Sequence, residues 1–183
     1  MPDFRALWAE ALSFDDFTAA SAEHGELWAG VHRLARIPGW AAAAAATAPR
    51  RRFLVLAEDW CNDGFSTVPV LARWAALSPA LELRILRRDE HPALMERYLT
   101  DGTRSIPIVI VLDEDFRELG HWGPRPVALQ EWVRANRASI PGDELRPQIR
   151  RWYARDHGES ALRELIDVAG VDAGETVATA PGR

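Results

Sequence analysis

The stretch that decides the fold is residues 53–64, which read FLVLAEDWCNDG. Its first four residues form a short apolar run bounded by polar residues, which is typical of a buried β-strand. A helical pattern follows the tryptophan and the cysteine, and we expect this helix to run from about Gly64 to Leu77. Pro69 lies inside it and should kink its axis. Cys61 is therefore predicted at a strand-to-helix junction.

Further elements follow toward the C-terminus. Residues 81–85 alternate between apolar and polar side chains, as a half-buried strand does, and residues 108–112 (IVIVL) form a second continuous apolar run. We expect a helix over about 89–98, a hairpin partner strand over 116–122 across the acidic turn 113–115, and a helix over about 127–138. The order β-α-β-α-β-β-α predicts an α/β fold with a four-stranded mixed sheet and helices on both faces.

Helical patterns also flank this unit. Apolar residues recur at helical spacing in the first ~48 residues and again in the region of Trp152 and Leu162. We expect a helical N-terminal extension over 1–50, the α/β core over 51–138, a C-terminal helical extension over 139–170 and a flexible tail over 171–183.

Composition excludes several functions. The chain has 183 residues and a net charge of −5, which argues against a nucleic-acid binder that neutralises phosphates. All 22 basic residues are arginine, so neither a Schiff-base lysine nor a P-loop lysine exists. The single cysteine excludes an intramolecular disulfide, and the five histidines lack metal-ligand spacing, so we expect no metal and no cofactor. The sequence shows neither a signal peptide nor a membrane span, so we expect a cytoplasmic protein.

Cys61 is the candidate reactive residue. A sulfur at a helix N-terminus has its thiolate stabilised by backbone N–H groups, which lowers its pKa. Carboxylates at Glu58, Asp59 and Asp63 oppose this effect, and Arg104 would offset them if its side chain reached the sulfur. The sequence leaves the sign of the pKa shift open, and an inert, buried cysteine is the alternative. We expect Arg125, which lies between two prolines, to form a structural salt bridge, with anion binding as the alternative.

These motifs resemble the thioredoxin family. The resemblance covers about 52–137 and depends on Glu-Asp-Trp-Cys over 58–61, the helix proline Pro69, Ile106-Pro107 before an apolar strand, and the glycines of the following hairpin. It is closest to bacterial thioredoxin-like proteins with a longer helical N-terminus and a Trp-Gly-Pro-Arg-Pro segment, here residues 122–126. The resemblance implies a thioredoxin-like fold.

The resemblance also implies roles for four residues. Cys61 corresponds to the attacking, catalytic cysteine, and Trp60 to the tryptophan that precedes it. Pro107 corresponds to a cis-proline that faces the sulfur and helps to hold an extended peptide, with Ile106 against the thiol. We therefore expect Trp60, Ile106 and Pro107 to bind substrate, and we add Arg104 as a candidate because its charge would reach the site from the same loop.

Two departures from the family pattern bear on function. Gly64 stands where the family has its resolving cysteine (CxxG in place of CxxC), and Val55 stands where it has a buried acid. We expect a monothiol thiol–disulfide oxidoreductase that needs an external resolving thiol. Its partner would be a protein or a low-molecular-weight thiol or disulfide, and its oligomeric state is left open.

Two alternatives remain open, a non-redox peptide-binding or protein-binding module and a thiol redox sensor. Gly64-Phe65-Ser66 also resembles the end of the motif of cluster-binding monothiol glutaredoxins, but it is out of register with Cys61.

Overall fold

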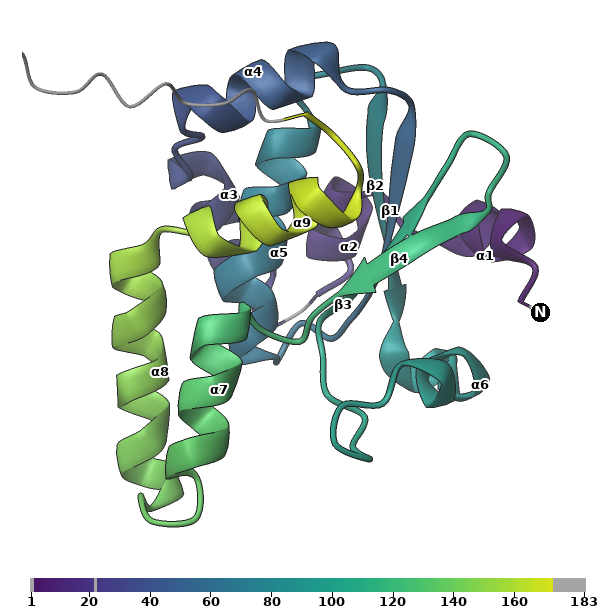
Figure 1. Ribbon diagram of the computed structural model, residues 1–183. Coiled ribbons are helices and arrows are strands. Elements are labelled where there is room, and N and C mark those ends of the chain that lie inside the picture. The colour runs from purple at the N-terminus through teal and green to yellow at the C-terminus, as the bar shows by residue number, and fades with distance from the viewer. Residues whose placement is uncertain (1, 22, 173–183) are drawn as a thin grey trace, which may run out of the picture.

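A computed structural model gives the structure of the chain and describes residues 2–21 and 23–172. The chain alternates helices and strands around one sheet (Figure 1). In order, the elements are α1 (Phe4–Glu10), α2 (Phe14–Ala19), α3 (Gly25–Leu34), α4 (Gly39–Thr47), β1 (Arg51–Ala57), α5 (Asn62–Ala75), β2 (Leu81–Arg87), η1 (Arg88–Glu90), α6 (Pro92–Met95), η2 (Glu96–Tyr98), β3 (Ile108–Leu112), β4 (Glu118–Trp122), α7 (Val127–Asn136), α8 (Gly142–Asp156) and α9 (Glu159–Val168).

The sheet has the predicted mixed topology. Its strand order is β2-β1-β3-β4, with β1 parallel to β2 and antiparallel to β3, and with β3 antiparallel to β4. The two central strands, β1 and β3, are the two continuous apolar runs of the sequence, because both of their faces are covered. The α/β class and the four-stranded mixed sheet with helices on both faces are thus confirmed.

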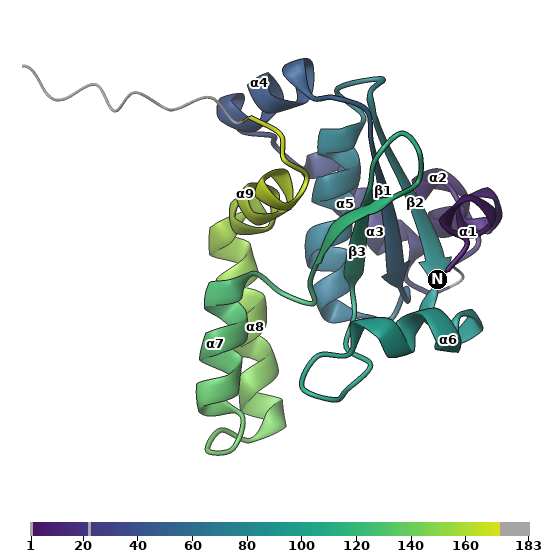
Figure 2. The same cartoon turned by 45° about the vertical axis from the view of Figure 1, so that its right-hand side comes forward.

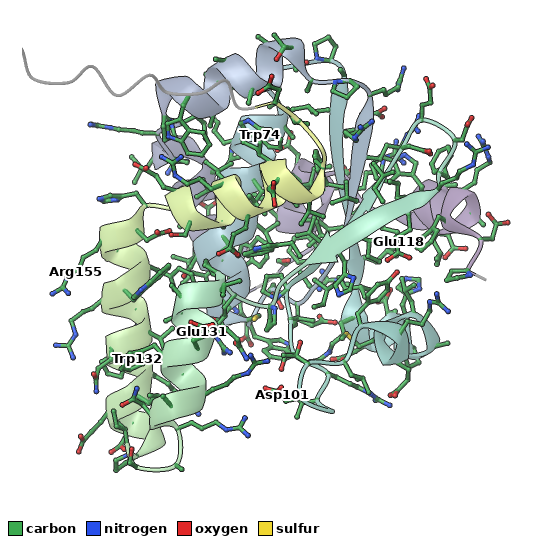
Figure 3. The ribbon with its side chains drawn as sticks, viewed as in Figure 1. Trp74, Asp101, Glu118, Glu131, Trp132 and Arg155 are labelled. Atoms are coloured by element: carbon green, nitrogen blue, oxygen red, sulfur yellow. The ribbon has the colours of Figure 1, made fainter. Side chains whose placement is uncertain are left out.

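Helices α3, α4, α5 and α9 contribute to the core on one face of the sheet. Phe53, Val55 and Val109 point into this core, where they meet fully buried Trp28 and Trp74. The indole of Trp74 donates to the carbonyl of Ala41 at 2.8 Å and so fastens α5 beneath α4 (Figure 3). Part of the predicted N-terminal extension is therefore an integral part of this core.

Helix α9 also belongs to this core. Ala161, Leu162, Leu165, Ile166 and Ala169 recur at helical spacing and are buried in the same cluster as β1 and α5. The core on this face of the sheet therefore continues past the predicted domain boundary at residue 138. Of the predicted tail over 171–183, residues 173–183 lie outside the described residues.

Helices α1 and α6 lie on the other side of the sheet (Figure 2). Leu54, Leu56, Ile108 and Ile110 alternate with the residues of the first face, as the two-residue period of a strand requires, and pack into a second cluster. Cys61 belongs to this second cluster.

The predicted helix over 127–138 forms as α7 but does not lie over the sheet. It pairs with α8 in a hairpin that projects from the sheet (Figure 1), held by Leu129, Val133, Ile149 and Tyr153. The apolar period of α7 is therefore satisfied by its neighbour in sequence, and α9 contacts β4 in its place.

Several element boundaries differ from the prediction, among them the starts of β4 and α5. Strand β4 begins at Glu118 instead of Phe116, because the Asp113 carboxylate accepts from the backbone N–H groups of Asp115 and Arg117 and holds them in the turn. Phe116 has a left-handed φ of 63° and packs its ring against Trp8. Helix α5 begins at Asn62, two residues before the predicted start.

In the described part of the chain, no helix combines the length and the apolar character needed to cross a membrane.

Candidate functional site

Cys61 occupies the N-cap of α5. Strand β1 ends at Ala57, and a short turn brings the chain to Cys61, whose backbone is extended (φ −78°, ψ 116°) immediately before the helix. The sulfur accepts a hydrogen bond from the N–H of Gly64 at 3.4 Å, which is the position that an N-cap oxygen normally occupies. The predicted placement of Cys61 at a strand-to-helix junction is therefore confirmed.

The loop before β3 lies against the sulfur. The Ile106–Pro107 peptide bond is cis, and the Ile106 carbonyl oxygen lies 3.3 Å from Sγ of Cys61, where it accepts from the thiol. Gly123 packs on the same loop with a φ of 125°, and a Cβ there would lie 2.2 Å from the Pro107 carbonyl oxygen. Residues 122–126 therefore pack against the loop beside Cys61 at Gly123, and a larger residue there would require the backbone to shift.

A buried polar network lies behind the first turn of α5. The Asp63 carboxylate pairs with the Arg125 guanidinium and accepts from the Tyr153 hydroxyl at 2.9 Å. Arg125 also donates to the side chain of Gln130 at 3.0 Å. The structural salt bridge expected of Arg125 is therefore present, and it joins α5 to the chain after β4 and to α8.

Burial raises the pKa of the Cys61 thiol to about 11. The N–H of Gly64 lowers it and the Asp63 carboxylate raises it, and the backbone N–H of Asp63 and the Arg125 guanidinium lower it further. The sequence left the sign of the pKa shift of Cys61 open. In the structure this pKa is raised, and desolvation contributes more to the rise than the acidic neighbours do. Cys61 is therefore mainly a neutral thiol at pH 7.

A cavity of about 320 Å³ opens beside the sulfur, between α5 and α8. Three arginines line it together with Cys61 and Asp63. Its walls are formed by Trp60, Cys61, Asn62, Asp63, Ser66, Arg125, Arg146, Ile149, Arg150 and Tyr153. Cys61 is buried, with 7% of its surface exposed, and it is one of the residues that line this cavity.

Three of the four predicted substrate-binding residues lie at the site. Trp60 is 51% exposed at the mouth of the cavity, with the Arg88 guanidinium 5.0 Å from its ring centroid, and Ile106 and Pro107 form the loop described above. Arg104 does not line the cavity, because its guanidinium pairs with the Glu96 carboxylate.

Sequence reasoning missed the contribution of α8. Tyr153, Arg146 and Arg150 lie on one helix face beside Cys61, about 90 residues away in the sequence. The sequence signal was their spacing of three and four residues, which places them on one side of a helix, but nothing in it shows which element that side meets.

Val55 and Gly64, the two residues that depart from the dithiol pattern, both lie against buried side chains of the first core. Val55 is fully buried in the first core, away from the Cys61 cluster. A Cβ at Gly64 would lie 3.2 Å from Cζ2 of Trp28, whose indole donates to the Asp59 carbonyl at 2.9 Å. The Trp28 ring therefore packs closely on the face of α5 that carries Gly64.

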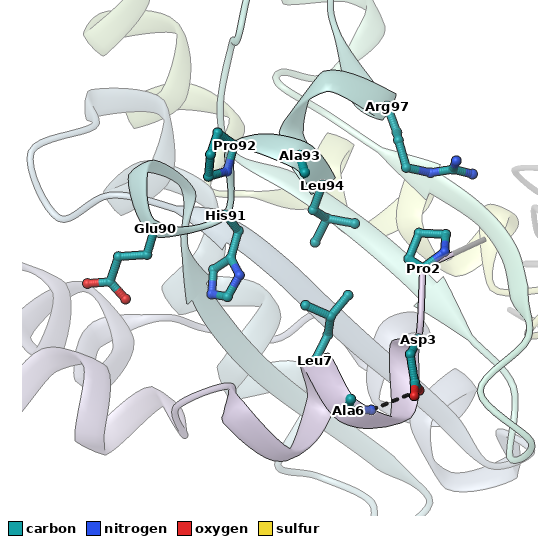
Figure 4. A pocket seen from close by; sticks show the side chains of 10 residues that line it. All are labelled: Pro2, Asp3, Ala6, Leu7, Glu90, His91, Pro92, Ala93, Leu94 and Arg97. Carbon is teal, nitrogen blue, oxygen red and sulfur yellow. Dashed lines mark hydrogen bonds between the residues drawn. The ribbon is translucent and has the colours of Figure 1, made fainter.

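A separate cavity of about 550 Å³ lies between α1 and α6 (Figure 4). Leu7 and Leu94 point toward one another across it, and Glu90 points away. This cavity does not include Cys61. Across residues 2–21 and 23–172, no group of three or more His, Cys, Asp or Glu side chains is placed to hold a metal ion.

Comparisons with known proteins agree with this geometry. Two similar solved structures are a protein of unknown function from Pseudomonas aeruginosa and an HIV epitope scaffold. The first is 23% identical over 93% of this chain and 98% of its own, with a TM-score of 0.74, and the second is 22% identical over 92% and 98%, with a TM-score of 0.71. At these identities the likeness shows the fold alone. No curated protein matches the chain.

A protein family described as thioredoxin matches residues 11–141, which include β1, the Cys61 turn, the Ile106–Pro107 loop and β4. The chain therefore belongs to the thioredoxin family.

Proposed function

We propose that the protein is a monothiol thiol–disulfide oxidoreductase that acts through Cys61. The observation that carries this proposal is the position of the sulfur, which lies at the first turn of α5 between the Gly64 N–H and the Ile106 carbonyl and faces an open cavity. The Cys61 thiolate attacks one sulfur of a disulfide RSSR′, so that Cys61–S–S–R forms and R′S⁻ leaves and takes up a proton. An external thiol then attacks the sulfur of R, which returns Cys61 as a thiol.

The raised pKa of the Cys61 thiol determines the rate of both steps of this exchange. With a pKa of about 11, Cys61 is mainly a neutral thiol at pH 7, so attack on a disulfide is slow. A thiol of high pKa is also a poor leaving group, so Cys61 leaves slowly when the external thiol attacks the sulfur of R. The geometry therefore favours a slow exchange reaction with a long-lived mixed disulfide. Trp60, Ile106 and Pro107 are proposed to hold the substrate.

The experiment measures mixed-disulfide formation by intact-mass spectrometry with 2-hydroxyethyl disulfide between pH 7 and pH 10. We expect a single adduct on Cys61 whose rate rises about tenfold per pH unit, since the thiolate fraction does so below a pKa of about 11. Cys61→Ser is the control and should form no adduct. A folded wild-type protein that forms no adduct at pH 10 would remove the proposal.

A second candidate function is a non-redox binding module. It is favoured by an apolar groove of about 830 Å³ that adjoins the cavity and is lined by Val31, Leu34, Phe65 and Val70 among others. The neutral thiol would then act as a hydrogen-bond donor to the Ile106 carbonyl. Binding of a peptide ligand that Cys61→Ser retains in full, with no adduct at any pH, would establish this function in place of the first.

The other parts of the proposal follow from the need for an external thiol. The partner is a protein or a low-molecular-weight thiol or disulfide, and a cytoplasmic location fits a single cysteine that reducing thiols keep free. A thiol sensor differs from this proposal only in its readout, since oxidation of Cys61 would then change a partner contact instead of completing a cycle.

A further inference from the structure

The cavity beside Cys61 has more positive than negative charge in its lining. Arg125, Arg146 and Arg150 line it, against the single carboxylate of Asp63. Asp63 is already paired with Arg125, so the charges of Arg146 and Arg150 are the surplus. An occupant of this cavity should therefore carry negative charge.

Arg146 and Arg150 are available to such an occupant. They lie four residues apart on α8 and hence on the same helix face, and both are exposed. Neither makes an ion pair or a side-chain hydrogen bond with any residue in the described ranges. A guanidinium presents several N–H donors in a planar fork that matches a carboxylate.

Arg125 has one donor without a partner. Its Nη2 pairs with Asp63 and its Nη1 donates to Gln130, but its Nε is buried and has no partner. Nearly all buried donors in proteins are satisfied, so this unpaired N–H is an exception, but the Nε atom itself is buried and does not reach an occupant of the cavity. Arg146 and Arg150 are therefore the donors that an occupant would meet.

We propose that this cavity binds the acidic half of a small disulfide, namely a low-molecular-weight thiol that carries carboxylate groups. This inference rests on the proposed function of Cys61. The carboxylates pair with Arg146 and Arg150, and the sulfur of the same molecule meets Sγ of Cys61, which lines the same cavity. A volume of about 320 Å³ lies at the lower end of the ~300–1,000 Å³ range of small-molecule sites, which fits a compact ligand.

The exchange proceeds in two balanced steps. The Cys61 thiolate attacks the sulfur of the acidic half R in RSSR′, the mixed disulfide Cys61–S–S–R forms in the cavity, and R′SH is released after protonation. A second acidic thiol RSH, acting as its thiolate, then attacks the sulfur of R, so that RSSR leaves and Cys61 regains its proton. The net reaction is RSSR′ + RSH → RSSR + R′SH.

The first test measures binding without sulfur chemistry. (Methylthio)succinate carries two carboxylates and no free thiol, and its affinity is measured by titration calorimetry and by NMR shifts at low salt. We expect Arg146→Gln and Arg150→Gln each to weaken binding by about tenfold, since a lost charge-assisted hydrogen bond has about this effect. Arg151→Gln is the matched control, because Arg151 is an exposed neighbour on α8 outside this cavity and its replacement should leave the affinity unchanged.

The second test compares three small symmetric disulfides, those of mercaptosuccinate, 2-mercaptoethanol and cysteamine, at pH 9. We expect the acidic disulfide to form the Cys61 adduct at least tenfold faster than the cationic one, and Arg146→Gln/Arg150→Gln to abolish this preference. Equal rates, together with arginine variants that bind (methylthio)succinate as the wild type does, would overturn this inference but leave the proposed function intact. No adduct with any disulfide would instead overturn the proposed function, and the binding data would then decide on the cavity alone.

Discussion

The replacement Gly64→Cys tests the site geometry most directly, because it restores the second thiol of a dithiol site. An ideal Cβ built at Gly64 lies 3.3 Å from Cβ of Cys61, slightly less than the ~3.5–4.5 Å that disulfides adopt. The same Cβ lies 3.2 Å from Cζ2 and 3.3 Å from Cη2 of Trp28. The two sulfurs are therefore within reach of one another, provided that the Trp28 ring shifts by a few tenths of an ångström.

Two effects of similar size determine the stability of this variant. Trp28 is fully buried and its indole is held by the Asp59 carbonyl, so the crowding should cost about 1–3 kcal/mol of the free energy of unfolding, as overpacking in cores does. A disulfide that closes a loop of four residues returns about 2 kcal/mol by limiting the unfolded chain. We expect the reduced variant to be less stable than the wild type by about 1–3 kcal/mol, and the oxidised variant to recover most of the loss.

The assay combines free-thiol titration with chemical denaturation of the oxidised and reduced forms. Gly64→Ser is the matched control, because it crowds Trp28 in the same way but cannot form a disulfide. If two free thiols persist in a folded, monomeric variant after oxidation, Cys61 does not lie at a thioredoxin-like helix start. If Gly64→Ser is as stable as the wild type, the close contact with Trp28 is refuted.

Four further predictions follow from the site. The wild type should barely accelerate insulin reduction by dithiothreitol, since no second thiol releases the mixed disulfide; turnover like that of a dithiol thioredoxin would contradict this. Asp63→Asn should lower the pKa of Cys61, measured by thiolate absorbance, because a carboxylate that raises it is lost and Arg125 stays; Asp59→Asn is the control. Tyr153→Phe should cost about 1–3 kcal/mol in denaturant unfolding, since the buried Asp63 loses a donor, and an unchanged midpoint would argue against this bond. Burial raises the pKa of Glu58, so the native state binds more protons than the unfolded chain, and the free energy of unfolding falls as the pH rises from 4.5 through the folded pKa. Glu58→Gln should lack this loss, and parallel stability–pH curves for the two proteins would refute the assignment.

Much of the fold could be predicted because local patterns specify it. The runs 53–56 and 108–112 are apolar and β-prone on both faces, which identifies central strands wherever they occur. Strand boundaries were less certain, since the start of β4 depends on how the Asp113 side chain caps a turn. The position of Cys61 followed from strand, turn and helix signals that are all within reach of one another along the chain.

The helical partners were harder to predict. An apolar stripe on 127–136 or on 161–169 shows that each helix buries one face, but both stripes are equally suited to the sheet. The structure assigns the sheet to α9 and pairs α7 with α8. The Glu164 carboxylate fixes this choice, because it accepts from the Trp122 indole at 2.7 Å and from the Val127 backbone N–H at 2.9 Å.

The sequence by itself determined the family, the single cysteine at a helix start and the absence of a second cysteine, since each depends on residue identity and local spacing. Only the tertiary structure decided the direction of the Cys61 pKa shift and the chemistry of its surroundings. Desolvation depends on how closely remote segments pack, and it raises the pKa of the thiol above the value that a helix N-terminus alone would give. The arginine-lined cavity likewise exists because α8, some 90 residues further along the chain, folds back against the start of α5.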